Sequence, residues 1–436
     1  MNTKGQDATF GRKGGIPVYR CRMETLQELK MEIGQASTSN KCKQTDSERL
    51  RLEDSRISIA LMSSLVVLTG QYFVLVSWNL MGTAMDHNIR ILSKILVGAS
   101  FAYALPIVLR RNKKGFIEAY AVWMFVFLLQ YLIFPENNVY QQRLTFPLFA
   151  MCLPTFIYSS TIYDWKVLRN VMSKASYIIF CLGLLLGIMV FWGKVSVGTY
   201  SMTLSYQLLL PAVMFIDGFL DRPSLRNVLF ALLSILLILA IGSRGSIMCI
   251  AVFIMLKLIR PPKKPRYSHI SAYLFSTSLV MTVGLFFDEL LMSIHDFLSR
   301  FGISSRSISL FLQPKLHLSG RDLLYSRMVA EIMDKPITGI GIGGDRRVLE
   351  GNWAHNIFLE LIANYGVILG ALFSLILLLL VIRSFLFRNE YQYDMFAIWL
   401  SVGVIPLLVS SSYLESMSGW LFLGLMYKDW AVTCKH

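Results

Sequence analysis

The residues best suited to chemistry in this 436-residue chain are one histidine and two arginines. His355 stands in the stretch GNWAHNIFLE, directly before a long apolar run. Imidazole has an unperturbed pKa of about 6.5, which suits proton abstraction near neutral pH. A helix that begins where a loop meets the membrane presents its first residues to water. His355 is therefore a candidate general base, although a lone histidine is also compatible with a purely structural role.

The two arginines occupy positions where a positive charge is costly. Arg244 lies in IGSRGS, at a turn between two short apolar stretches, and Arg321 lies near the start of SGRDLLYSRMVAEIMDKP. Arginine at the centre of a membrane helix costs at least about 2.5–3.5 kcal/mol and usually marks a ligand path or a buried pair. A cation in the first turn of a helix opposes the helix dipole, so Arg321 favours an anionic partner. The alternatives are that Arg244 extends to lipid headgroups and that Arg321 pairs with a carboxylate on its own helix.

Three further residues are secondary candidates. Asn356 either orients His355 or caps the helix that follows, whereas Arg346 and Arg347 either contact a glycan or phosphate or form a solvated surface pair. The two arginines end ITGIGIGGDRR, whose GxGxxG pattern lacks the strand and helix that a nucleotide site requires. Its glycines predict a tight loop whose amides can approach a phosphate or sugar. No DxD pair stands near these residues, so we expect neither a metal nor another cofactor.

The elements that must position these residues are membrane helices. Hydrophobic residues make up 55% and charged residues 16% of the chain, against about 45–50% and about 25% in soluble domains. Apolar runs of close to 20 residues, the length that crosses a bilayer, recur along the sequence. We predict an all-α polytopic membrane protein with about twelve transmembrane helices. The expected spans are 57–79, 91–109, 115–134, 144–163, 174–192, 202–219, 227–242, 245–260, 270–287, 365–383, 394–413 and 417–433.

The spans divide the chain into four parts. Residues 1–56 form a basic cytoplasmic tail, expected to be partly disordered, and residues 57–287 hold the first nine spans. Residues 288–354 form one long extracytoplasmic loop with an amphipathic helix. Residues 355–436 supply a helix at the membrane rim, the last three spans and a short cytoplasmic end.

The distribution of positive charge predicts the orientation. Cytoplasmic joints are enriched in Lys and Arg, and 29 of the 42 such residues fall on one side when both termini are placed in the cytoplasm. Anionic lipid headgroups attract such a basic rim, so the net charge of +15 gives no reason to expect a nucleic-acid partner. None of the six cysteines lies in the long loop, which argues against a disulfide framework there, and their spacing suggests no zinc site.

Four motifs together resemble one known family. They are SRG at 243–245, SGR at 319–321, PITGIGIG at 336–343 and AHNIFLELIANYGVILG at 354–370. In this order they are similar to motifs of the O-antigen polymerase and O-antigen ligase family of bacterial envelope glycosyltransferases. The resemblance is strongest over about 241–370 and absent over the first fifty residues.

The resemblance implies a fold similar to C-type membrane glycosyltransferases and a site on the outer face of the bacterial inner membrane. The implied substrates are a glycan linked to undecaprenyl pyrophosphate and a glycan acceptor, and the implied partners are membrane lipids and a chain-length regulator. In the family, the arginines that match Arg244 and Arg321 are proposed to bind the pyrophosphate, and the histidine that matches His355 is proposed to activate the acceptor hydroxyl. The expected reaction is an inverting, metal-independent displacement.

Three functions remain open at this point. We favour a polymerase that transfers a growing chain onto the next lipid-linked repeat unit in O-antigen or exopolysaccharide synthesis. The alternative is a ligase that transfers the same glycan to lipid A–core oligosaccharide. From another class, a polytopic chain is also compatible with a polysaccharide or lipid transporter or flippase. Transporters place their sites near the membrane midplane, whereas the polar candidates here gather on one side.

Overall fold

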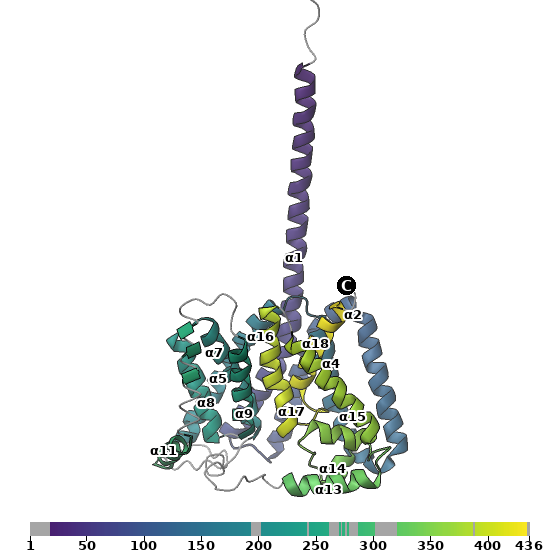
Figure 1. Cartoon of the computed structure of the whole chain (residues 1–436), viewed down its shortest axis with the longest axis vertical. Coiled ribbons are helices and arrows are strands. Elements are labelled where there is room, and N and C mark those ends of the chain that lie inside the picture. The colour runs from purple at the N-terminus through teal and green to yellow at the C-terminus, as the bar shows by residue number, and fades with distance from the viewer. Residues whose placement is uncertain are drawn as a thin grey trace, which may run out of the picture. The chain divides into compact units, whose positions relative to one another are not determined.

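The computed structural model describes residues 18–192, 202–241, 244–260, 270–271, 273–274, 277–278, 287–300, 321–386 and 389–433. The chain divides into two units, residues 1–52 and 53–436. In the first unit the described backbone is helical from Val18 on. The sequence predicted that this tail is partly disordered. All regular structure in the described part of the chain is helical (Figure 1), which confirms the all-α class.

The helices follow one another with short joints. Their bounds are α1 (Val18–Ser77), α2 (Ala84–Ile133), η1 (Pro135–Asn137), α3 (Asn138–Phe146), η2 (Pro147–Cys152), α4 (Leu153–Thr161), α5 (Trp165–Phe191), α6 (Met202–Gln207), α7 (Leu209–Asp221), α8 (Leu225–Ile241), α9 (Arg244–Ile259), α11 (Phe287–Arg300), α13 (Arg321–Asp334), α14 (Gly344–Val348), α15 (Ile357–Phe385), α16 (Glu390–Trp399), η3 (Leu400–Val404), α17 (Ile405–Val409) and α18 (Met417–Thr433).

Seven helices in the described residues are long and apolar enough to cross a membrane, so the expected number of twelve is not confirmed. The expected spans 91–109 and 115–134 both fall in α2, whose backbone leaves the helical region at Asn112 (φ −147°, ψ 48°). α9 has 16 residues, about 24 Å at 1.5 Å per residue, which is shorter than the roughly 30 Å hydrocarbon core. Most of the expected span 270–287 lies outside the described residues.

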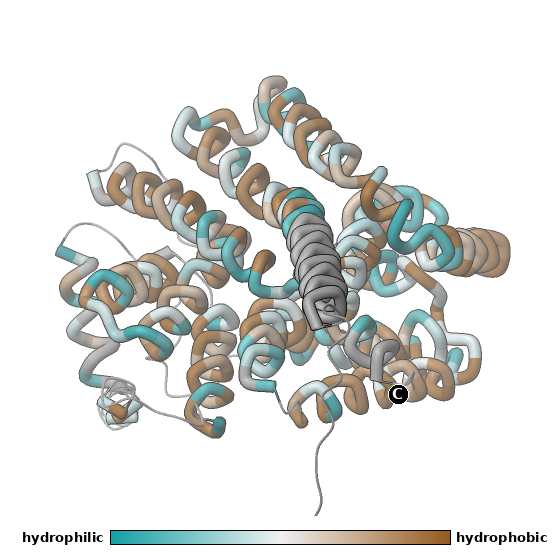
Figure 2. Tube along the Cα trace, turned by 90° about the horizontal axis from the view of Figure 1, so that it is seen from above, coloured by the Kyte–Doolittle hydropathy of each residue, from teal (hydrophilic) through white to brown (hydrophobic). Residues whose placement is uncertain are grey.

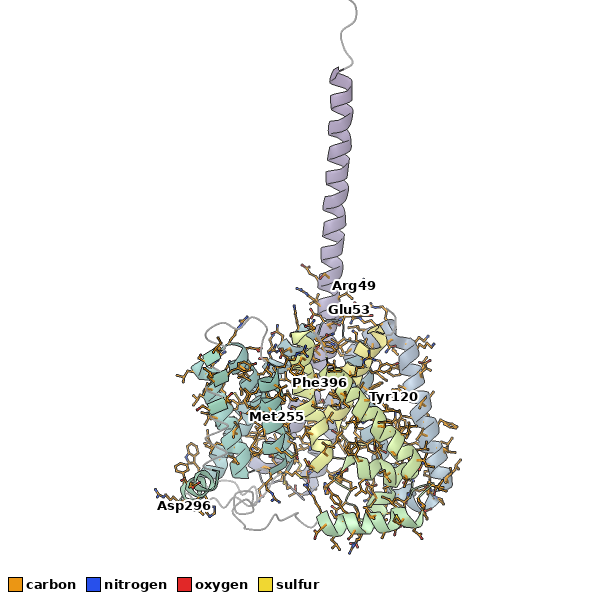
Figure 3. All side chains as sticks on the ribbon, viewed as in Figure 1. Arg49, Glu53, Tyr120, Met255, Asp296 and Phe396 are labelled. Atoms are coloured by element: carbon orange, nitrogen blue, oxygen red, sulfur yellow. The ribbon has the colours of Figure 1, made fainter. Side chains whose placement is uncertain are left out.

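The apolar core of the second unit lies where α4, α7, η3 and α18 meet. Trp399, Phe422 and Tyr158 are fully buried there, and Phe396 of α16, which is labelled in Figure 3, belongs to the same buried cluster. Hydrophobic residues also cover outward flanks of the bundle (Figure 2). In α15 only 11% of the most apolar window is buried. Such an exposed apolar flank is expected of a helix that faces lipid.

α13 lies across one end of the bundle, beside α14 and the start of α15 (Figure 1). Met328 and Ile332 are buried against residues of those neighbours, in a small second core. The neighbouring Val329 and Met333 are not part of this buried row. Their side chains are 47% and 72% exposed. A single row of side chains, one helical turn apart, therefore docks α13.

A cluster of five charged side chains lies at the C-terminal end of α9. Lys257, in the last turn of α9, contacts Asp394 of α16 at 2.7 Å and Asp217 of α7 at 2.9 Å. Arg169 of α5 pairs with Asp217 and Asp221 and lies 3.7 Å from Asp394. Ion pairs thus connect four helices at the end opposite Arg244.

Candidate active site

His355 is held in a strained backbone conformation just before α15. Its φ is +54°, a left-handed value that is uncommon outside glycine and persists where the surroundings enforce it. Its Nδ1 lies 2.8 Å from the carbonyl oxygen of Ser410, the residue directly after α17. Because a carbonyl only accepts hydrogen bonds, Nδ1 carries the proton and Nε2 carries the lone pair. The imidazole is therefore presented as a base.

The surroundings also keep this imidazole neutral. Burial lowers the pKa of His355 below its usual 6.5, and the positive charge of Arg321 lowers it further. The hydrogen bond to Ser410 and the charge of Asp345 act in the opposite direction without cancelling the shift. The structure thus brings Arg321 and His355 close enough to interact electrostatically, and the lowered pKa favours the neutral imidazole.

Arg244 starts α9, which approaches the same turn. The next residue, Gly245, lies against Val409: a Cβ added at Gly245 would lie 3.4 Å from Val409 Cγ2. Val409 immediately precedes Ser410, whose carbonyl holds His355. The start of α9, the start of α13 and the approach to α15 therefore lie around the end of α17. The roles assigned to Arg244, Arg321 and His355 stay predictions.

Trp353 is a member of the site that the sequence analysis missed. Its indole Nε1 donates to the Ser410 carbonyl at 2.7 Å, so that oxygen accepts hydrogen bonds from both Trp353 and His355. The two rings lie 4.9 Å apart. In the sequence, the only sign of a role for Trp353 is its place two residues before the histidine in GNWAHN.

Arg346 is buried, so the expected solvated surface pair is wrong. Its side chain is 6% exposed and contacts Asp345 at 3.0 Å and Glu360 at 3.5 Å. It also donates to Ser412 Oγ at 2.9 Å, and Ser412 Oγ donates to Glu360 at 2.5 Å. A buried polar network therefore fixes the residues that follow Ser410 to the first turn of α15.

Arg347 belongs to the docking of the glycine-rich loop. Its Nε donates to Asn137 Oδ1 at 3.0 Å, and Asn137 Nδ2 donates to the carbonyl of Ile340 at 2.7 Å. The amide of Ile342 donates to Gln130 Oε1 at 3.0 Å. A Cβ at Gly341 (φ +78°) would lie 2.5 Å from the Phe134 ring. The loop glycines thus allow close packing on α2. We expected the loop amides to face a phosphate or sugar, but the Ile342 amide bonds to Gln130 instead.

Asn356 caps α15. Its side-chain oxygen accepts hydrogen bonds from the amides of Phe358 at 3.0 Å and Leu359 at 3.2 Å. Of the two alternatives, the capping role is therefore the one that its described contacts support. The cap fixes where α15 begins, and His355 is the residue directly before the cap.

A cavity of about 290 Å³ lies against the end of α17. Ser410 and Trp353 both line it. None of its described lining residues is charged. Its polar lining consists of Thr69, Tyr206, Gln207, Ser410, Ser411 and Ser418. Among the described residues, no group of three or more His, Cys, Asp or Glu side chains is arranged to hold a metal ion.

Comparison with known proteins supports the resemblance found in the sequence. Residues 229–374 match the family model described as O-antigen ligase. The matched segment contains Arg244, Arg321 and His355. No curated protein and no solved structure matches the chain. Together with the long apolar helices, the match supports an integral membrane protein with a role in polysaccharide assembly that is similar to the O-antigen ligase family over residues 229–374.

Proposed function

From this family match we propose that the protein is an O-antigen or exopolysaccharide polymerase, a glycosyltransferase of the bacterial inner membrane. It transfers a glycan from undecaprenyl pyrophosphate onto a lipid-linked repeat unit. The observation that carries the proposal is the hydrogen bond between His355 Nδ1 and the Ser410 carbonyl, in surroundings where burial and the charge of Arg321 lower the pKa of the imidazole.

In the proposed reaction, His355 Nε2 removes the proton from an acceptor sugar hydroxyl. The hydroxyl oxygen forms a bond to the anomeric carbon of the donor, and the bond from that carbon to the pyrophosphate breaks with inversion. Arg244 and Arg321 bind the departing diphosphate, because guanidinium groups offer several donors in a planar arrangement that matches phosphate oxygens. Neutralising the leaving group stabilises the charge that develops in the transition state. The proton leaves His355 for water when the product departs.

The proposed site faces the outside of the cell, and both termini face the cytoplasm. The Lys and Arg excess at the joints supports this orientation. α9 is consistent with it, because Arg244 begins the helix and Lys257 lies in its last turn, in a segment rich in basic residues.

The ligase remains the second candidate, because the matched family model carries that description. The two functions share donor and chemistry and differ in the acceptor. A strain that lacks a polymerase retains single repeats on its surface acceptors. A strain that lacks a ligase accumulates long chains on undecaprenyl pyrophosphate.

The test uses the purified protein in nanodiscs with undecaprenyl-pyrophosphate repeat units, with and without EDTA. We expect chain growth that survives EDTA and is lost in His355→Gln. His87→Gln is the matched control, because His87 is an exposed histidine of α2. Adding lipid A–core as a second acceptor separates ligase from polymerase products. Dependence on a divalent cation, or full activity of His355→Gln, contradicts the mechanism, and transport of the lipid-linked glycan without transfer supports a flippase.

A further inference from the structure

The cavity beside Ser410 has the chemistry of a site for an uncharged sugar. Its polar groups are hydroxyls and one amide, and its described lining holds no charged side chain. Sites for phosphate use charged donors such as arginine, whereas a neutral sugar needs neutral hydrogen-bonding groups beside an apolar surface. A pyrophosphate and a neutral sugar therefore need different surroundings, and the described lining of this cavity suits the neutral sugar.

Trp353 provides the apolar surface. Its indole nitrogen is fixed on the Ser410 carbonyl at 2.7 Å, so the orientation of the ring is set before any ligand binds. An aromatic ring offers a broad apolar face next to a polar edge. A pyranose has a matching face of C–H groups and a rim of hydroxyls. Because the Trp353 and His355 rings lie 4.9 Å apart, a sugar that rests on the indole lies near the imidazole.

Gln207 carries a hydrogen-bond acceptor that has no donor among the described residues. Its side chain lines the cavity, and its Oε1 is buried without a hydrogen-bond partner among the described residues. Such a buried acceptor is uncommon in native proteins and costs stability unless a ligand or water satisfies it. The helix that carries Gln207 is joined to the start of α9 by the hydrogen bond of Ser205 to Ser246 at 2.8 Å. Gln207 is thus held near the helix that begins with Arg244.

We infer that this cavity is the subsite for one uncharged pyranose ring of the acceptor. Trp353 is the platform under the ring, and Gln207 accepts a hydrogen bond from one of its hydroxyls. Both are specificity-determining residues. The acceptor role rests on the proposed glycosyl transfer, whereas binding of a neutral sugar at Trp353 does not.

The binding test uses saturation-transfer NMR on the full-length protein in nanodiscs. The probes are the methyl glycosides of glucose, galactose, N-acetylglucosamine and rhamnose, with glucuronic acid and glucose 1-phosphate as charged sugars. We expect binding of at least one neutral glycoside and weaker binding of both charged sugars. Affinity should fall about tenfold in Trp353→Ala and about threefold in Gln207→Leu. Trp353→Phe, which retains a ring, should keep most of the affinity.

Two control variants carry the same changes at exposed positions. Trp78→Ala removes a tryptophan that is 68% exposed, and Gln142→Leu removes an exposed glutamine of α3; neither should change binding. Gln207→Leu supplies a further check, because it removes a buried unsatisfied acceptor. Its melting temperature should stay equal to that of the wild type or rise while sugar affinity falls, a combination that loss of folding does not produce.

Kinetics separate this inference from the proposed function. In the nanodisc transfer assay, Gln207→Leu and Trp353→Ala should raise the KM for the acceptor and leave the KM for the donor unchanged. Transfer with an unchanged acceptor KM in Gln207→Leu and Trp353→Ala overturns the inference alone. Neutral-sugar binding that depends on Trp353 without any transfer overturns the polymerase proposal and leaves the sugar site standing. Equal binding of charged sugars, or no loss of binding in Trp353→Ala, also overturns the inference.

Discussion

Replacing Arg346 with methionine removes the only cation that contacts two fully buried carboxylates among the described residues. The stem of Arg346 is kept in this variant, but Asp345 and Glu360, both 0% exposed, lose the guanidinium that lies 3.0 Å and 3.5 Å away. Removing one partner of a buried ion pair costs about 3–5 kcal/mol, because the other charge stays buried without compensation. The lost hydrogen bond to Ser412 belongs to the same network and is included in that figure. We therefore expect the free energy of unfolding to fall by about 3–5 kcal/mol.

The assay is reversible unfolding in mixed micelles, followed by tryptophan fluorescence. Arg347→Met is the matched control, since Arg347 contacts the neutral side chain of Asn137 and its loss exposes no carboxylate. It should cost no more than about 1.5 kcal/mol. Adding Glu360→Gln to Arg346→Met should recover part of the loss, because one unpaired carboxylate is then removed. A loss below about 1 kcal/mol in Arg346→Met, or an equal loss in both arginine variants, would refute this reasoning.

Three further predictions follow from the geometry around α15. Because the pKa of His355 lies below 6.5 and the base must be neutral, transfer rates should fall with decreasing pH through a midpoint below 6.5. The midpoint of the His355 NMR titration should move upward in Arg321→Gln, and a wild-type midpoint at or above 6.5 contradicts the assignment. Asn356→Ala should lower the free energy of unfolding by about 1 kcal/mol while Asn356→Asp retains most of it, and equal losses would exclude a capping role. Gly366→Ala should lose at least about 1–3 kcal/mol, because φ is +80° and the new Cβ would lie 2.0 Å from the Ile337 carbonyl oxygen. Gly98→Ala, with open space around it, should not, and equal stability of the two variants would contradict the clash.

The fold class was predictable because apolar runs of membrane-spanning length are a local signal. The basic stretch around Asn112 marked a joint, and the structure breaks α2 there. The start of α15 was also foreseeable, since an asparagine before an apolar run is a strong capping pattern. The number of spans stays a prediction, because α9 is shorter than the hydrocarbon core is thick and most of 270–287 lies outside the described residues.

Contacts between distant residues limited the prediction of the site. Arg346 lies beside Asp345 and Arg347 in sequence, which resembles a solvated surface, yet its partner Ser412 is 66 residues away. The glycine-rich loop similarly meets Gln130 over a separation of 212 residues. Trp353 acquires its role only because the chain after α17 brings the Ser410 carbonyl to its indole nitrogen. The residues next to each partner in the sequence contain no signal for such pairings.

The charged cluster at the end of α9 bears on how the chain is made. Lys257 and Asp394 are 137 residues apart, so synthesis at about 5–20 residues per second separates them by roughly 7–27 s. During that interval Arg169 and Lys257 already have Asp217 and Asp221 as counterions. A nascent chain that ends before α16 is thus electrically balanced at this point. Because Asp217 and Asp221 are synthesised before Lys257, the buried lysine has counterions before Asp394 is made.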